Sequence, residues 1–97
     1  KENMVKSIEE GHIYKLDNAQ EISFLKRVNG EMIHDGTTNE EVLEMLIDRI
    51  QYLNKKLPCR ENSIVITKLE ESLMWLNKRT EIRVSQNVEK LDIPHKS

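Results

Sequence analysis

Cysteine, aromatic residues and long hydrophobic runs are all scarce in this sequence of 97 residues. Cys59 is the only cysteine, which excludes a disulfide framework within the chain and favours an intracellular setting. No apolar stretch approaches the ~20 residues that span a bilayer, and no signal-peptide pattern is seen, so we expect a cytoplasmic protein. Aromatic residues make up 4% and charged residues 33%, a balance that favours a helix-rich domain over a β-sandwich.

Motifs for catalysis and metal binding are missing as well. The histidines are His12, His34 and His95, and their spacing contains no HxxxH or CxxC pattern of a zinc site. There is no glycine-rich phosphate loop and no nucleophile elbow. The net charge of −2 gives no overall positive potential that would attract the phosphate backbone of DNA or RNA. We therefore expect that the protein is not an enzyme, has no metal site and no cofactor, and does not bind along DNA or RNA.

Two long helical patterns are present in the second half of the chain. The first runs from about residue 39 to 54, with leucine and isoleucine at spacings of 3, 4, 3 and 4 (Leu43, Leu46, Ile50, Leu53, Leu57). The second runs from about residue 60 to 85 and repeats the spacing (Ile66, Leu69, Leu73, Leu76). Pro58 separates them, so the short loop predicts an antiparallel helix pair. Such helices cannot bury wide apolar faces alone, so we expect an oligomer.

A β-hairpin is predicted before the helices. Asn29-Gly30 is the strongest short hairpin signal, because both residues reach positive φ in a type I′ turn, and it predicts strands within residues 22–34. Residues 1–21 are interpreted as an N-terminal arm, 22–88 as the hairpin domain and 89–97 as a flexible tail. The predicted fold class is mainly α: an antiparallel two-helix hairpin preceded by a short β-hairpin and assembled into an oligomer.

The start of the first helix has two interpretations. Thr38 followed by Glu41 fits a capping box, in which the threonine hydroxyl accepts a bond from a free backbone N–H. Thr37, Thr38 and the free N–H groups of the same helix start also suit a phosphate.

The second helix ends with cations. Lys78, Arg79 and Arg83 return to the start of the first helix in an antiparallel pair, where they would form a phosphate pocket. The alternative is pairing with the helix dipole and with surface acids such as Glu81. For stacking on a base, Tyr14 is the better exposed candidate, whereas Trp75 fits a core or an interface.

Several of these runs resemble a known family. They are GTTNEEVL at residues 36–43, LIDR at 46–49, PCREN at 58–62 and ITKLEESLMWL at 66–76. The stretch from about residue 22 to 88 is similar to the helical hairpin domain of phage anti-CBASS and anti-Thoeris sponge proteins. That resemblance implies an oligomer, often a hexamer, that binds a cyclic oligonucleotide or a cyclic ADP-ribose isomer of bacterial immunity and holds it intact in the infected cell.

The resemblance also assigns roles to residues. A threonine at the start of the first helix contacts ligand in such sponges, and Thr37 or Thr38 stands there. A basic residue late in the second helix binds phosphate, matching Lys78 or Arg79, and a tyrosine before the hairpin stacks on a base, matching Tyr14. A lysine that binds dinucleotide in some members is replaced here by His34 and Asp35. The Asn29-Gly30 hairpin is closer to the anti-Thoeris type.

Two other hypotheses stay open. A structural oligomerisation module of phage origin would use its apolar faces only for contacts between subunits and would bind no small molecule. A small enzyme would convert a bound nucleotide, with Cys59 beside Arg60 as its only reactive side chain of note.

Overall fold

The computed structural model describes residues 4–33 and 35–86. They divide into two compact units, a β unit that ends at Thr38 and a helical unit that begins at Asn39. Each unit is described by itself. The predicted tail, residues 89–97, lies outside the described residues, as do His34 and His95. In the described ranges, no helix is long and apolar enough to cross a membrane.

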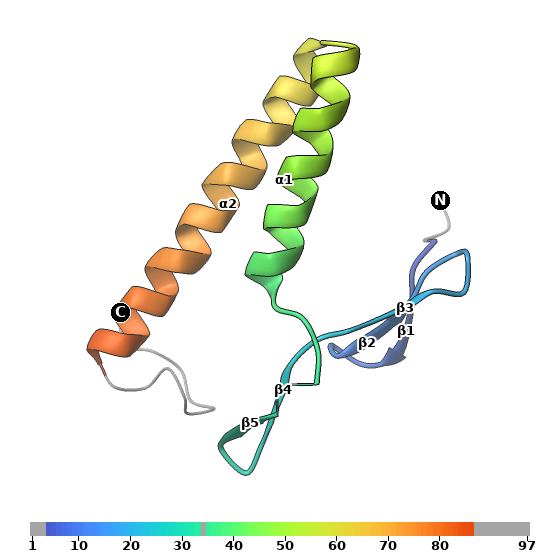
Figure 1. The fold of residues 1–97 in the computed structure, drawn as a ribbon. Coiled ribbons are helices and arrows are strands. Elements are labelled where there is room, and N and C mark those ends of the chain that lie inside the picture. Colours follow the sequence, from blue (N-terminus) through green and yellow to red (C-terminus); the bar gives the residue numbers. More distant parts are fainter. Residues whose placement is uncertain (1–3, 34, 87–97) are drawn as a thin grey trace. The chain divides into compact units, whose positions relative to one another are not determined.

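The helical unit is the predicted antiparallel hairpin. Helix α1 (Asn39–Lys56) and helix α2 (Arg60–Ser85) pack along their lengths and are joined by residues 57–59 (Figure 1). Both helices have the predicted starts, and α1 continues two residues beyond its predicted end. Acidic residues in the first turn of α1 and lysines in its last turn complement the helix dipole.

The first turn of α2 is capped by a residue that the sequence did not indicate. The N-cap is Cys59, whose Sγ accepts a hydrogen bond from the Asn62 backbone N–H at 3.4 Å. The Cys59 N–H in turn donates to Oδ1 of Asn54 at 3.1 Å. Cys59 thus closes the loop between the helices, and its thiol is exposed.

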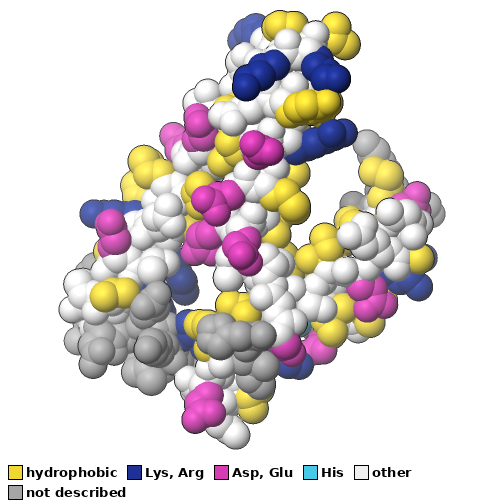
Figure 2. All heavy atoms as spheres, in the orientation of Figure 1, with side chains coloured by type: hydrophobic (Ala, Val, Ile, Leu, Met, Phe, Trp, Pro, Cys, Tyr) yellow, Lys and Arg dark blue, Asp and Glu magenta, His cyan; other side chains and the backbone are white. Residues whose placement is uncertain are grey.

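The seam between the helices is only half-buried. Most of its predicted apolar positions are partly covered (Leu43, Ile50, Leu53, Ile66, Leu69, Leu73, Leu76), and Leu46 is 40% exposed. No hydrophobic residue in the described parts of the chain is fully buried. Large apolar side chains are instead exposed, including Trp75 at 63%, Met45 at 58% and Tyr52 at 51% (Figure 2). The pair leaves much apolar surface in water.

The β unit contains a three-stranded antiparallel sheet that the sequence did not predict. Strands β1 (Lys6–Glu9), β2 (Ile13–Lys15) and β3 (Glu21–Ser23) pair in that order, with Tyr14 opposite Ile22. The stretch interpreted from the sequence as an N-terminal arm, residues 1–21, therefore contains strands. Two tight turns connect them, and each holds a residue with positive φ, Gly11 at 75° and Ala19 at 71°.

The predicted β-hairpin is confirmed and is shorter than expected. Strands β4 (Lys26–Val28) and β5 (Glu31–Ile33) form a separate two-stranded sheet. The turn residues Asn29 and Gly30 have φ of 54° and 80°, as a type I′ turn requires. Residues 22 and 23 belong to β3 instead. The fold class is therefore mixed, about half helical, with the helical hairpin correctly predicted and the strand content underestimated.

Candidate functional site

The segment before α1 is held in the β unit by backbone pairing. The Thr37 N–H donates to the Ser23 carbonyl at 2.8 Å, and the Leu25 N–H donates to the Thr37 carbonyl at 2.9 Å. This places Thr37 beside Phe24 in an isolated parallel bridge. Gly36 allows the approach, because a Cβ atom there would lie 2.5 Å from the Ser23 carbonyl oxygen. The position of Thr37 is thus fixed by its main chain.

Thr38 directly precedes the first residue of α1 and is half-buried, as is Thr37. The Thr37 hydroxyl donates to the Thr38 carbonyl at 3.4 Å. Thr38 and Glu41 each have an interaction partner within the chain. The capping box between them stays a prediction. The predicted position of the helix start itself is confirmed, because α1 begins at Asn39.

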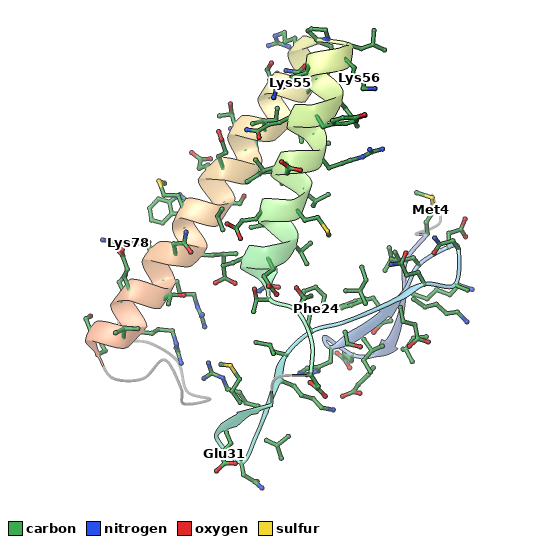
Figure 3. All side chains as sticks on the ribbon, in the orientation of Figure 1. Met4, Phe24, Glu31, Lys55, Lys56 and Lys78 are labelled. Atoms are coloured by element: carbon green, nitrogen blue, oxygen red, sulfur yellow. The ribbon has the colours of Figure 1, made fainter. Side chains whose placement is uncertain are left out.

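Tyr14 lies on β2 and is less available than the sequence suggested. Its ring packs edge to face on the ring of Phe24, with the ring centroids 5.8 Å apart and the ring planes at 89°. Phe24 is labelled in Figure 3. Tyr14 is half-buried and Trp75 is 63% exposed, so the expectation that Tyr14 is the better exposed of the two was wrong. Trp75 does not lie in a core of this chain, and its place at an interface stays a prediction. Tyr14 can still present its remaining surface to a base.

Phe24 is the residue that sequence reasoning missed. Its ring contacts Tyr14, its backbone bridges to Thr37, and its N–H donates to the His12 carbonyl at 2.7 Å. The structure therefore brings Tyr14 and Thr37 to the same phenylalanine within the β unit. The sequence placed Phe24 in a strand, whereas the structure has it in an isolated bridge between β3 and β4. The sequence held no signal that this position joins two candidate residues.

The three predicted cations all lie near the end of α2. Helix α2 has 26 residues and α1 has 18, so the last turns of α2 extend past the first residue of α1 by roughly 12 Å at 1.5 Å per residue. Lys78 and Arg79 are exposed, and Lys78 projects away from α1 (Figure 3). Arg83 is 4% exposed and has an interaction partner within the chain.

These cations do not share one face. Arg79 and Arg83 are four residues apart and lie on the same side of α2, whereas Lys78 is rotated by about 100° from Arg79. A ligand on the arginine side would therefore meet the exposed guanidinium of Arg79, a group that suits bidentate phosphate contacts. Tyr14, Thr37 and Thr38 belong to the β unit, and the three cations belong to the helical unit.

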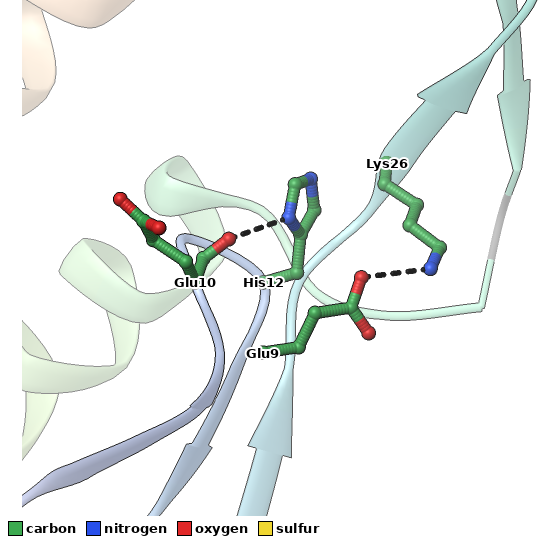
Figure 4. Close-up of polar contacts among 4 residues, drawn as sticks. All are labelled: Glu9, Glu10, His12 and Lys26. Atoms are coloured by element: carbon green, nitrogen blue, oxygen red, sulfur yellow. Dashed lines mark hydrogen bonds and ion pairs between the residues drawn. The ribbon is translucent and has the colours of Figure 1, made fainter.

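One ion pair holds parts of the β unit together. Nζ of Lys26, on β4, lies 3.0 Å from Oε1 of Glu9, on β1 (Figure 4). The hydrogen bond and the charge of Lys26 lower the pKa of the Glu9 carboxyl, and the same contact raises the pKa of Lys26. Beside this pair, Nδ1 of His12 lies 3.0 Å from the Glu10 carbonyl oxygen, which fits a protonated Nδ1 donating to it. The ion pair between Glu9 and Lys26 thus joins β4 to β1, the edge strand of the three-stranded sheet.

Metal ligands do not cluster in the described parts of the chain. Within residues 4–33 and 35–86, no three His, Cys, Asp or Glu side chains could hold one metal ion. A shallow depression of about 270 Å³ lies along the first turns of α2, lined by Arg60, Ser63, Ile64, Thr67 and Lys68. It contains none of the predicted site residues.

Known proteins are similar to this chain in sequence. Residues 17–81 match the Acb2/Tad1 hairpin domain. Over 56 residues the chain is 54% identical to Thoeris anti-defense 1 of Bacillus phage SBSphiJ7, a stretch that covers 57% of this chain and 39% of that protein. The chain thus aligns with well under half of that relative. Because the family match covers more than half of the sequence, with all of α1 and most of α2, the chain belongs to the Acb2/Tad1 hairpin-domain family.

Proposed function

We propose that the protein is a phage anti-defence sponge, which binds a cyclic nucleotide immune signal in the infected bacterial cytoplasm and withholds it from its effector. The 54% identity to Thoeris anti-defense 1 carries this proposal. A cyclic ADP-ribose isomer of Thoeris-type defence is the first ligand class. Cyclic di- or trinucleotides of CBASS-type defence are the second.

Each candidate residue has a physical role in this function. The first turn of α1 and the hydroxyl groups of Thr37 and Thr38 would receive a phosphate oxygen, which a helix N-terminus suits. Arg79 supplies charge and paired hydrogen bonds to a phosphate, with Lys78 and Arg83 adding positive potential. Tyr14 provides apolar ring surface for a base. Sequestration requires binding alone, so the protein is not an enzyme and the ligand leaves intact.

The functional form is a homo-oligomer, and a hexamer is the expected size. The half-buried seam and the exposed Trp75, Met45 and Tyr52 support this, since apolar surface of this kind is typical of subunit interfaces. A pocket built from two or more copies would bring together residues that one copy holds in separate units.

Isothermal titration tests the function directly. The purified protein is titrated with cyclic ADP-ribose isomers and with cyclic di- and trinucleotides, and AMP serves as a control. We expect one cyclic ligand to bind and to be recovered unchanged by chromatography after the complex is denatured. Absence of heat from every cyclic ligand would contradict the proposal, and a converted nucleotide would favour an enzyme.

Variants test the residue assignment. Thr38→Ala and Arg79→Ala should each weaken binding by roughly tenfold or more, the size of a lost charge-assisted contact. Lys68→Ala is the matched control, because Lys68 is an exposed cation of α2 outside the proposed site. Wild-type affinity in both site variants would remove the assignment while leaving the function open.

A structural oligomerisation module is the second candidate. The observation that favours it is the lack of any fully buried hydrophobic side chain among the described residues, together with large exposed ones. This hypothesis expects a stable oligomer with no affinity for any cyclic nucleotide in the titration.

A further inference from the structure

The turn that joins β4 to β5 consists of an asparagine followed by a glycine (Figure 1). Asn29-Gly30 is the only such pair in the chain, and both residues are exposed. A Cβ atom added at Gly30 would meet nothing within 4 Å, so no neighbouring group covers that side of the glycine. Because glycine has no side chain, its backbone nitrogen is the least hindered nitrogen that can follow an asparagine.

The Gly30 nitrogen is not held by the hairpin. The strand pairing next to the turn is Val28 opposite Glu31, and Gly30 lies between these two residues. Outside the strand ladders, no backbone hydrogen bond among the described residues involves Gly30. Its N–H group can therefore lose its proton to a base without breaking a bond of the sheet, and the nitrogen can then move toward the side-chain carbon Cγ of Asn29.

Asn18, the exposed asparagine of the turn between β2 and β3, has different surroundings. The Ala19 N–H that follows it donates to the Leu16 carbonyl at 2.9 Å, and Oδ1 of Asn18 accepts from the Gln20 N–H at 3.0 Å. Both the nitrogen that would attack and the amide that would be attacked are thus held. In the interior of α1 and α2, the N–H group after an asparagine is a donor of the helix ladder.

We propose that Asn29 is a site of spontaneous deamidation, in which its side-chain amide is lost through a cyclic imide formed with the nitrogen of Gly30. The Gly30 nitrogen, after a base has taken its proton, forms a bond to Cγ of Asn29. The bond from Cγ to Nδ2 then breaks, and Nδ2 takes up a proton and leaves as ammonia. Water opens the ring by adding at Cγ, which gives aspartate, or at the backbone carbonyl carbon, which gives isoaspartate. Water is the only co-reactant, and nothing is oxidised or reduced.

The isoaspartate product changes the geometry of the hairpin. The main chain then runs through Cβ and Cγ of position 29, so the turn gains one backbone carbon. A type I′ turn of two residues fixes the register of its strands, and a two-stranded hairpin is marginally stable. The longer turn should therefore weaken the pairing of β4 with β5. The reaction requires no nucleotide, so the proposal does not depend on the proposed function.

Peptide mapping over time tests the site. The purified protein is kept without nucleotide in neutral and in mildly alkaline buffer, and samples are digested with trypsin. Cleavage after lysine and arginine places Asn18 in residues 16–26 and Asn29 in residues 28–49. Mass spectrometry with fragmentation should locate the change from amide to acid at Asn29, about tenfold or more faster than at Asn18, a ratio that a small difference in activation free energy produces. The rate should rise with pH, because the attacking nitrogen must lose its proton.

Two variants separate the proposed chemistry from general ageing of the protein. Asn29→Gln would have to form a larger ring and should suppress the change at this position. Asn18→Gln is the matched control and should leave the rate at Asn29 as in the wild type. Circular dichroism checks that both variants are folded, and the comparison of the two sites in the wild type needs no variant. The proposal is overturned if Asn29 changes no faster than Asn18 in the folded wild type, or if its rate does not rise with pH.

Discussion

Gly36 leaves no room for a side chain, because its Cα lies against the backbone of Ser23 and Phe24. Gly36→Ala should therefore lower the free energy of unfolding by about 2 kcal/mol, as overpacking against a rigid neighbour does. Urea denaturation followed by circular dichroism measures the loss. In Gly11→Ala the new Cβ atom meets open space, so only the positive φ is strained, and the loss should be about 1 kcal/mol. Equal losses would contradict the close approach at Gly36.

The Glu9–Lys26 pair predicts a pH dependence with a definite sign. The pKa of Glu9 is lowered, so the stabilisation is present above the ordinary carboxyl range and is lost as the pH falls through the lowered pKa. The pKa of Lys26 is raised, so the contact is also lost as the pH rises through that higher pKa. In Lys26→Met, an NMR titration should show the pKa of Glu9 moving up to its ordinary range. Lys15→Met removes another exposed lysine and should leave it unchanged.

Sequence patterns differed in how well they located single residues. Asn29-Gly30 identified a turn because few residue pairs accept positive φ at both positions. Ala19 also has positive φ, which an alanine in the sequence does not predict. Exposure of aromatics was predicted in the wrong order, because Tyr14 packs on Phe24 through a sheet that the sequence did not predict.

At the scale of elements, periodicity decided what could be predicted. Helices α1 and α2 contain 18 and 26 residues, long enough for the leucine spacing to repeat, and Pro58 marks the break between them. Strands β1, β2 and β3 have only three or four residues each, too few for alternation to be distinguished from chance. Their pairing is a tertiary property.

The cap of α2 leads to an element-scale prediction. Cys59→Ala removes the acceptor of the Asn62 N–H and should lower the free energy of unfolding by about 1 kcal/mol. Cys59→Ser keeps an acceptor of a better type and should be at least as stable as the wild type. Thermal denaturation of the three proteins measures the order. A Cys59→Ala protein as stable as the Cys59→Ser protein would show that the thiol contributes nothing as a cap.

At the scale of the whole molecule, the family and the helical hairpin were predictable, and the assembled site was not. The candidate residues were chosen because an antiparallel pair returns the end of α2 to the start of α1. The structure confirms the antiparallel pair. It assigns Tyr14, Thr37 and Thr38 to one compact unit and the cations to another, a division that helical spacing could not reveal.

The resemblance left open whether Lys78 or Arg79 is the phosphate-binding residue, and we propose Arg79. Arg79 shares its side of α2 with the buried Arg83, whereas Lys78 projects away from α1 (Figure 3). For the cyclic nucleotide that binds most tightly, Arg79→Ala should weaken affinity by roughly 10- to 100-fold, a loss of about 1.5–3 kcal/mol for a charge-assisted contact. Lys78→Ala should change it less than about threefold, as expected of an exposed charge that acts only through water. Isothermal titration at two salt concentrations measures both variants. A larger loss in Lys78→Ala would place the phosphate on the opposite side of α2, away from Arg83.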